Sequence, residues 1–151
     1  MAEYRRPSPE TAPCHAKAAG LYMICTLSKH AAESKGYADA LMLDWRGRVA
    51  EATGANVFFV DNNVLHTPEP DCFLDGITRR TVIELARARG LEIVERAIMP
   101  DEMEKFSECF ITGTAAEVTP VSEIGPYKFT PGDISINLLN DYLALVGGQS
   151  A

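Results

Sequence analysis

Two spacings of apolar residues alternate along this chain, one typical of helices and one typical of strands. The first helical stripe consists of Leu21, Ile24, Cys25, Ser28 and Ala32, and it ends near Gly36. A second helix is predicted over 78–90, with Thr78 as its N-cap and Gly90 as its stop. A short helix with proline in its first turn is predicted over 100–106, and a closing amphipathic helix from Asp133.

Strand-like patterns fill most of the remaining chain. They cover residues 37–44, 48–61 with an interruption at 53–55, 64–67, 91–98, and 108–125 as two strands around a small-residue turn. Asp61, Asn62 and Asn63 predict a hairpin turn between two of these strands. Residues 1–13 carry three prolines and read as an extended arm or linker. The pattern therefore predicts one lobe of mixed α/β (α+β) class.

Composition and charge limit the classes of molecule that this chain is expected to bind. The chain has 151 residues and a net charge of -7, and its 14 basic residues are scattered, which argues against a nucleic-acid groove. The N-terminus lacks the apolar stretch of a signal peptide, and the most apolar segment, 19–27, is too short to span a membrane. We therefore expect a soluble, cytoplasmic protein without a nucleic-acid or membrane partner.

The four cysteines form no CxxC pair and no metal-like spacing with the three histidines. A chain of this length builds a sufficient core without disulfides. The sequence therefore predicts reduced cysteines and no metal site.

Lys17 stands among small residues, in "CHAKAAGLY". It is either a solvated surface charge or an amine left accessible for a Schiff base. Glu51 lies in an apolar strand pattern, so it is either a buried carboxylate that needs a cationic or hydrogen-bonding partner, or a strand-edge residue facing water.

Two further segments could bind an anion. In 75–79, a glycine precedes a helix start whose free N–H groups suit a phosphate, although an ordinary capped helix has the same sequence. In 113–117, a run of small residues could form a nest of N–H groups, or simply a tight turn between strands.

The order of these pieces resembles the fold-type IV pyridoxal-phosphate enzymes. The matching residues are the segment 17–20 (Lys-Ala-Ala-Gly), then Glu51, Thr53, Asn56, Val57, Phe58, Leu65, Thr67, Leu74, Gly76, Ile77 and Arg79. The segment "TGTAAEVTPV", 112–121, is typical of the branched-chain aminotransferases within this group. The resemblance implies the C-terminal lobe of that fold, a mostly antiparallel sheet or pseudo-barrel with flanking helices, over 14–151. Residues 1–13 would be the interlobe linker, and the N-terminal lobe would be absent from this chain.

The resemblance also implies roles for single residues. Lys17 would form the Schiff base with pyridoxal 5'-phosphate and then move a proton between the substrate Cα and the cofactor. Tyr22 would contact the phenolic oxygen of the cofactor. Glu51 would pair with the pyridine nitrogen, which makes the ring a stronger electron sink.

The remaining roles concern the ring face, the phosphate and the substrate. Leu74 would pack on the ring, and the N–H groups of Ile77 and Thr78 would bind the 5'-phosphate. Thr114 would reach the phosphate, and Thr114 and Ala115 would bind the substrate carboxylate.

The resemblance implies transamination of branched-chain L-amino acids with 2-oxoglutarate or glutamate, in a homo-oligomer such as a homodimer. Alternatives within the family are a D-amino acid transaminase and an aminodeoxychorismate lyase. An alternative of another class is a non-catalytic dimerising lobe. The isolated lobe is expected to bind the cofactor weakly and to catalyse poorly.

Overall fold

The computed structural model describes residues 1–147. Its helical elements are η1 (Ala19–Leu21), α1 (Met23–Glu33), α2 (Ile77–Ala88), η2 (Pro100–Lys105) and α3 (Asp133–Gly147), where η1 and η2 are 3-10 helices. Its strands are β1 (Leu41–Leu43), β2 (Val49–Ala52), β3 (Asn56–Asp61), β4 (Val64–Thr67), β5 (Glu92–Glu95), β6 (Glu108–Gly113), β7 (Glu117–Pro120), β8 (Glu123–Ile124) and β9 (Tyr127–Lys128).

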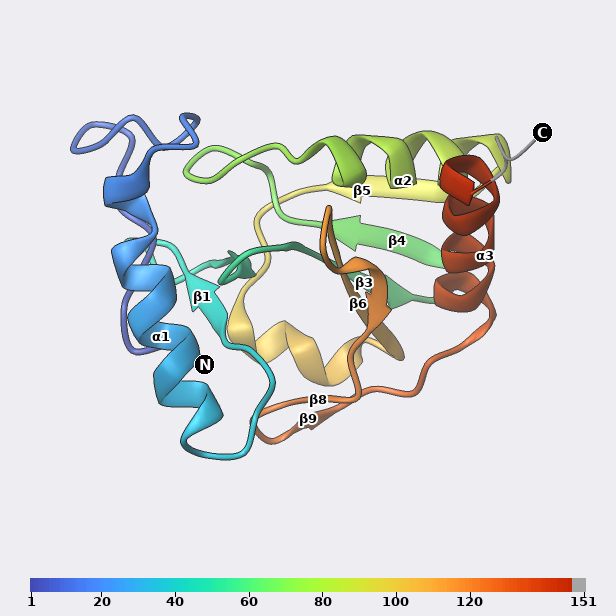
Figure 1. The fold of residues 1–151 in the computed structure, drawn as a ribbon. Helices are drawn as coiled ribbons and strands as arrows, with labels where there is room; N and C mark the ends of the chain where they lie inside the picture. The colour runs from blue at the N-terminus through green and yellow to red at the C-terminus, as the bar shows by residue number, and fades with distance from the viewer. Residues whose placement is uncertain (148–151) are drawn as a thin grey trace.

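A five-stranded sheet in the order β5-β4-β3-β6-β7 forms the centre of the lobe. Its strand pairs are antiparallel except β4–β5, which is parallel because α2 connects these two strands. The two-stranded ribbon β1–β2 lies on the side of the sheet where α1 stands, while α2 and α3 lie together at the other side (Figure 1). The predicted mixed α/β class with a mostly antiparallel sheet is confirmed.

Strand β3 explains how the sheet builds a core on both faces. Its apolar run alternates sides: Val57 and Phe59 pack into one cluster, with η2 residues, and Phe58 and Val60 into another, with α2 and α3. Phe58 stacks on Phe110 of β6 with ring centroids 5.0 Å apart. A continuous apolar strand is therefore the correct pattern here, because both of its faces are covered.

The β3–β4 hairpin agrees with the turn predicted at 61–63. Asn62 and Asn63 have φ of 47° and 66°, the left-handed conformation that a two-residue hairpin turn of type I′ requires at both central positions. Asparagine adopts this conformation more easily than most residues, because its short polar side chain bonds locally.

Helix α3 begins on a buried carboxylate of β6. Glu108 Oε2 accepts the backbone N–H groups of Gly132, at 3.0 Å, and Ser135, at 2.9 Å. A Cβ at position 132 would lie 2.5 Å from Glu108 Oε1, so only glycine lets the chain pass so close. The helix predicted from Asp133 is confirmed, and Glu108 satisfies its first N–H groups.

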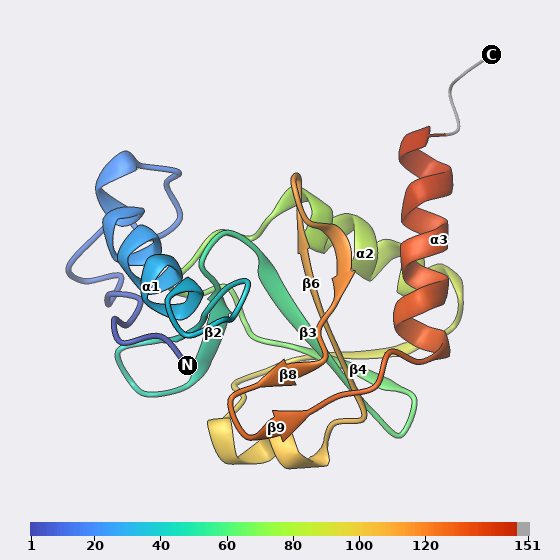
Figure 2. The same ribbon diagram turned by 60° about the horizontal axis from the view of Figure 1, so that its bottom comes forward.

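Some predicted boundaries were wrong. The strand predicted at 37–44 is limited to β1, because Gly36 turns the chain at φ 85° and Asp39 instead accepts a hydrogen bond from the Thr53 hydroxyl. Helix α2 starts at Ile77, so its N-cap is Gly76 and not Thr78. The β8–β9 hairpin, which packs beside η2 below the sheet (Figure 2), was not foreseen as a separate element.

Candidate active site

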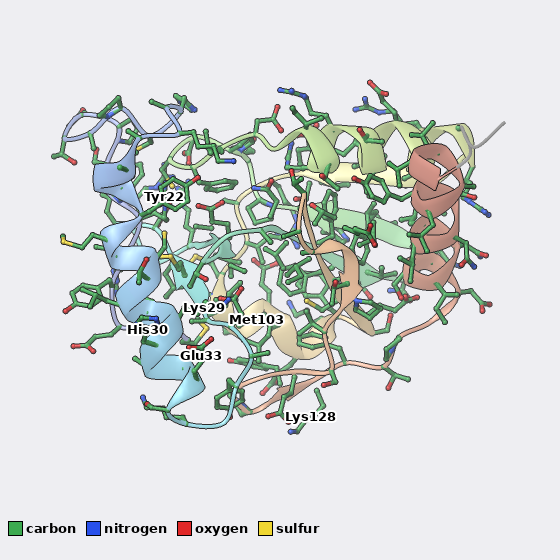
Figure 3. All side chains as sticks on the ribbon, in the orientation of Figure 1. Tyr22, Lys29, His30, Glu33, Met103 and Lys128 are labelled. Carbon is green, nitrogen blue, oxygen red and sulfur yellow. The ribbon has the colours of Figure 1, made fainter. Side chains whose placement is uncertain are left out.

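Lys17 lies in the loop that leads into η1, and its side chain is exposed. None of the ion pairs found within residues 1–147 includes it. Tyr22 follows η1 directly and is half-buried at the upper end of α1, whereas Lys29, His30 and Glu33 lie further along that helix (Figure 3). The 3-10 turn of η1 thus separates the loop that carries Lys17 from Tyr22 at the start of α1.

A small apolar cluster fixes the Lys17 loop to two other predicted site segments. Cys14, three residues before Lys17, is buried against Ala50, Cys72 and Phe73. Ala50 immediately precedes Glu51, and Phe73 immediately precedes Leu74. The cluster thus brings three segments together that are distant in sequence, and each carries a predicted cofactor residue at its edge.

Glu51 is buried on β2, with 8% of its surface exposed. Its Oε1 atom lies 3.3 Å from Nε of Arg6, which is itself 4% exposed. Its Oε2 atom lies 3.5 Å from Nδ2 of Asn56, at the far limit of a hydrogen bond. The buried alternative for Glu51 is the observed one, and its cationic partner comes from the N-terminal arm.

Burial raises the pKa of Glu51 to about 8, and the Arg6 guanidinium offsets this rise only in part. The pKa of the Tyr22 hydroxyl is also raised, first by burial and then by the neighbouring Glu51. Tyr22 therefore keeps its proton and can donate a hydrogen bond, while Glu51 is poised to exchange a proton near neutral pH.

Asn56 connects Glu51 to the start of α2. Its Nδ2 donates to the Leu74 carbonyl oxygen at 2.9 Å, and its Oδ1 accepts from the Gly76 N–H at 3.2 Å. A Cβ at position 76 would lie 2.5 Å from Asn56 Oδ1, so the close approach requires glycine. The loop that carries Leu74 is thereby held against β3.

The start of α2 presents the two residues predicted to bind phosphate. Gly76 has no side chain with which to cap the helix, so the first N–H groups, on Ile77 and Thr78, are left for another acceptor. Thr78 is buried, while Ile77 is 76% exposed. The N–H groups and the helix dipole together favour an anion at this end of α2.

Arg79, in the first turn of α2, is 2% exposed and holds this loop in place. Its guanidinium pairs with Asp75 at 2.8 Å and Glu95 at 2.7 Å, and it donates to the Pro68 carbonyl oxygen at 3.1 Å. Both terminal nitrogens of the guanidinium are used in these contacts, so Arg79 stabilises the loop.

Thr114 and Ala115 lie in the turn between β6 and β7, and both are exposed. A Cβ at Gly113 would lie 3.3 Å from the Gly54 carbonyl oxygen, so this turn packs closely on the turn that follows β2. The structure therefore places Thr114 and Ala115 on an open turn that borders the strand carrying Glu51.

Two residues of this site were absent from the site predicted from sequence. Arg6 lies in the arm predicted as a linker, and Asn56 was noticed only as part of a motif. The need of a buried Glu51 for a cation was the signal for Arg6, but sequence spacing did not indicate which arginine supplies it.

Asp44, Asp71 and Cys72 form another cluster of metal-ligating side chains, with ligand atoms within 4.8 Å of one another. Nη2 of Arg46 already lies 2.6 Å from Asp44 and 2.5 Å from Asp71. The guanidinium supplies the positive charge that these two carboxylates need.

A cleft of about 820 Å³ lies beside α1. The arm, the loop 35–41 and the β7–β9 region line it, and Ser28 and Ala32 contribute from α1. None of the predicted site residues lines this cleft. No helix within residues 1–147 has the length and apolar character needed to cross a membrane.

Comparison with known proteins adds independent information. The family "Amino-transferase class IV" matches residues 2–124. A probable branched-chain-amino-acid aminotransferase of Rickettsia bellii is 45% identical over 152 residues, which cover 98% of this chain and 53% of that protein.

Solved structures agree in fold. The branched-chain aminotransferase of Thermoproteus uzoniensis with norvaline superposes with a TM-score of 0.95 at 36% identity, covering 99% of this chain and 51% of that one. The branched-chain amino acid aminotransferase of Thermobaculum terrenum, in its PLP-form, gives 0.93 at 37% identity, with 99% and 50% covered. The chain thus spans about half the length of the relatives it matches.

Proposed function

The chain belongs to the class IV aminotransferase family, and on that premise we propose that it is the cofactor-binding lobe of a pyridoxal-phosphate-dependent branched-chain aminotransferase. The observation that carries the proposal is Glu51, a buried carboxylate whose Arg6 partner, at 3.3 Å, makes no hydrogen bond to it and whose one N–H donor among the described residues, on Asn56, is 3.5 Å away. A buried carboxylate normally accepts short hydrogen bonds. Glu51 therefore has an acceptor free for a ligand N–H, as the protonated pyridine nitrogen provides.

The other candidate site residues fit the phosphate and the ring face of pyridoxal phosphate. Phosphate suits the uncapped start of α2, with the N–H groups of Ile77 and Thr78, and the Thr114 hydroxyl would be a further donor. Leu74 would pack on the ring face, since Asn56 holds its loop. Pyridoxal phosphate, when bound, supplies an aldehyde that an amine can attack and a ring that accepts electrons from the substrate Cα.

Each side chain then has a distinct task. Glu51 binds the ring nitrogen and keeps it protonated, because its charge is poorly solvated and gains most from a cationic partner. Lys17 is the nucleophilic amine and, once released, moves the proton to and from the substrate Cα. Tyr22 keeps its proton and donates to the phenolic oxygen of the ring. Thr114 and the backbone of Ala115 bind the substrate carboxylate.

We propose branched-chain L-amino acids as substrates, with 2-oxoglutarate and glutamate as the second pair. Support comes from "TGTAAEVTPV" at 112–121 and from relatives named branched-chain-amino-acid aminotransferase, including one of Pseudomonas aeruginosa at 41% identity. Activity with D-alanine or aminodeoxychorismate in place of L-valine would contradict this choice of substrate.

We further propose that the functional protein has a second, N-terminal lobe, reached through the arm 1–13, and that it is a cytoplasmic homo-oligomer. The relatives are about twice as long as this chain. Met23 and Leu27, one helical turn apart on α1, are 63% and 45% exposed, which fits a surface that another lobe or subunit covers. Sedimentation of the chain together with that lobe tests the assembly.

The first test is cofactor attachment at Lys17. Pyridoxal phosphate is added to the chain, the mixture is reduced with borohydride, and peptide mass spectrometry locates the pyridoxyl label. We expect the pyridoxyl label on Lys17. Lys17→Ala should lose both this label and the visible absorbance band of the bound cofactor, measured before reduction, while the exposed control Lys29→Ala should keep the label on Lys17 and the band. A label distributed equally over Lys17 and Lys29 would contradict the proposal. Full-length relatives are the positive control for transamination of L-valine.

A further inference from the structure

Arg6 contacts two parts of the proposed site although it lies in the N-terminal arm. Its backbone N–H donates to the Leu43 carbonyl oxygen at 2.8 Å, and it forms a bridge with Asp44, so the arm runs beside β1. Glu51 pairs with Met42 on the opposite edge of β1. The side chains of Arg6 and Glu51 thus meet across one strand, which backbone hydrogen bonds hold in register.

The same guanidinium also reaches the turn that separates Lys17 from Tyr22. Nη1 of Arg6 donates to the Leu21 carbonyl oxygen and to Sγ of Cys25, each at 3.4 Å. Arg6 therefore links the turn of η1 to the Glu51 carboxylate through one buried side chain.

The contact between Arg6 and Glu51 is an ion pair with poor hydrogen-bond geometry. Nε of Arg6 lies 3.3 Å from Oε1, yet its N–H, buried from solvent, finds no hydrogen-bond acceptor within residues 1–147. The attraction is thus mainly Coulombic, and the carboxylate is not fully engaged by it. Such a partner supplies charge and leaves the oxygen available for a further N–H.

Resting on the function proposed above, we propose that Arg6 is a positioning residue, whose charge favours the ionised form of the Glu51 carboxyl and directs that group at the ring nitrogen of the cofactor. The groups that face Glu51 from the neighbouring elements support this role. Tyr22 and Cys25, from the start of α1, keep their protons because their pKa values are raised by burial, and Asn56 of β3 is neutral. Arg6 is the group that lowers the pKa of Glu51.

The decisive experiment is a carbon-13 NMR titration of the Glu51 carboxyl in the cofactor-free chain, assigned by its loss in Glu51→Gln. In Arg6→Met the midpoint of Glu51 should rise by about one pH unit or more, because an opposite charge at this distance is lost. Arg6→Lys should bring it back to within about half a unit of the native value. Arg5→Met, the exposed neighbour, is the matched control and should leave the midpoint unchanged.

A second measurement separates positioning from simple packing. We compare the affinity for pyridoxal phosphate with that for an analogue whose ring nitrogen is replaced by carbon. Arg6→Met should weaken binding of pyridoxal phosphate at least about tenfold more than binding of the analogue, as a unit of pKa implies. Equal losses for the two compounds, or an unchanged Glu51 midpoint in Arg6→Met, would overturn the inference.

If Arg6→Met does not fold, a measurement on the native protein still tests the inference. The Nε–H resonance of Arg6 should shift with the midpoint of Glu51, and this shift should vanish in Glu51→Gln. An Arg6 Nε–H resonance that does not shift while Glu51 titrates would overturn the inference. Failure of the native chain to bind pyridoxal phosphate at Lys17 would instead contradict the proposed function, whereas the titration would still report on the action of Arg6.

Discussion

Glu51 and Glu108 are equally buried, each with 8% of its surface exposed, yet their surroundings differ completely. Glu108 accepts two backbone N–H groups at 3.0 and 2.9 Å, at the start of α3. Glu51 has a guanidinium at 3.3 Å and an amide at 3.5 Å, neither in good hydrogen-bond geometry. Hydrogen-bond partners, and not burial, therefore distinguish a structural carboxylate from one available to a ligand.

The largest expected effect is the pH dependence that Glu51 gives to the stability of the cofactor-free chain. Its pKa is about 8 in the fold against 4.5 in the unfolded chain, so the fold binds an extra proton between these values. The contribution to stability is complete below about pH 4.5 and is lost as pH rises through about 8. The free energy of unfolding should therefore fall by up to about 1.4 kcal/mol per pH unit across this window.

Urea unfolding at several pH values checks this dependence. Glu51→Gln should flatten it and stabilise the chain at about pH 8 relative to the native protein. Glu108→Gln retains Glu51 and should therefore retain the slope. An unchanged slope in Glu51→Gln would show that Glu51 is not the carboxyl responsible.

Next in size is the removal of the structural carboxylate. Glu108→Ala leaves the N–H groups of Gly132 and Ser135 without their acceptor, so the free energy of unfolding should fall by about 3 kcal/mol. Exposed Glu104→Ala on η2 is the control, with an expected change within about 0.5 kcal/mol. Equal effects of the two changes in urea unfolding would refute the capping role of Glu108.

Gly132→Ala tests the same contact from the other side. The added Cβ would lie 2.5 Å from Glu108 Oε1, and moving the carboxylate weakens both of its hydrogen bonds. We expect a loss of about 2 kcal/mol, measured by urea unfolding. Gly20→Ala meets no atom within 4 Å and serves as the control. A tolerated alanine at 132 would mean that Glu108 can move without cost.

Gly76→Ala is the counterpart near Glu51. The Cβ would lie 2.5 Å from Asn56 Oδ1, so Asn56 must give way and release the loop that carries Leu74. Stability should fall by only about 1 kcal/mol, while the affinity for pyridoxal phosphate falls about tenfold. Fluorescence titration with the cofactor measures this, and an unchanged affinity would argue against the loop as part of the site.

Much of the fold follows from local sequence. The alternation of Val57 and Phe59 with Phe58 and Val60 predicts a strand with two buried faces, and Asn62-Asn63 predicts its hairpin. Boundaries were less predictable, because tertiary contacts decide them. Helix α2 starts at Ile77 since Asn56, twenty residues earlier, fixes the N–H of Gly76. The strand predicted at 37–44 starts only at Leu41 for a similar reason, because Asp39 accepts a hydrogen bond from the Thr53 hydroxyl instead.

The sequence by itself determined the residue types of the site: a lysine among small residues, an acid in an apolar strand pattern, and a glycine before a helix start. Their chemistry depends on side-chain type and near neighbours, which the sequence states directly. Only the tertiary structure decided that Arg6 is the partner of Glu51 and that Asn56 joins Glu51 to the start of α2. Both depend on strand register and loop packing, and these arise from contacts between segments distant in sequence.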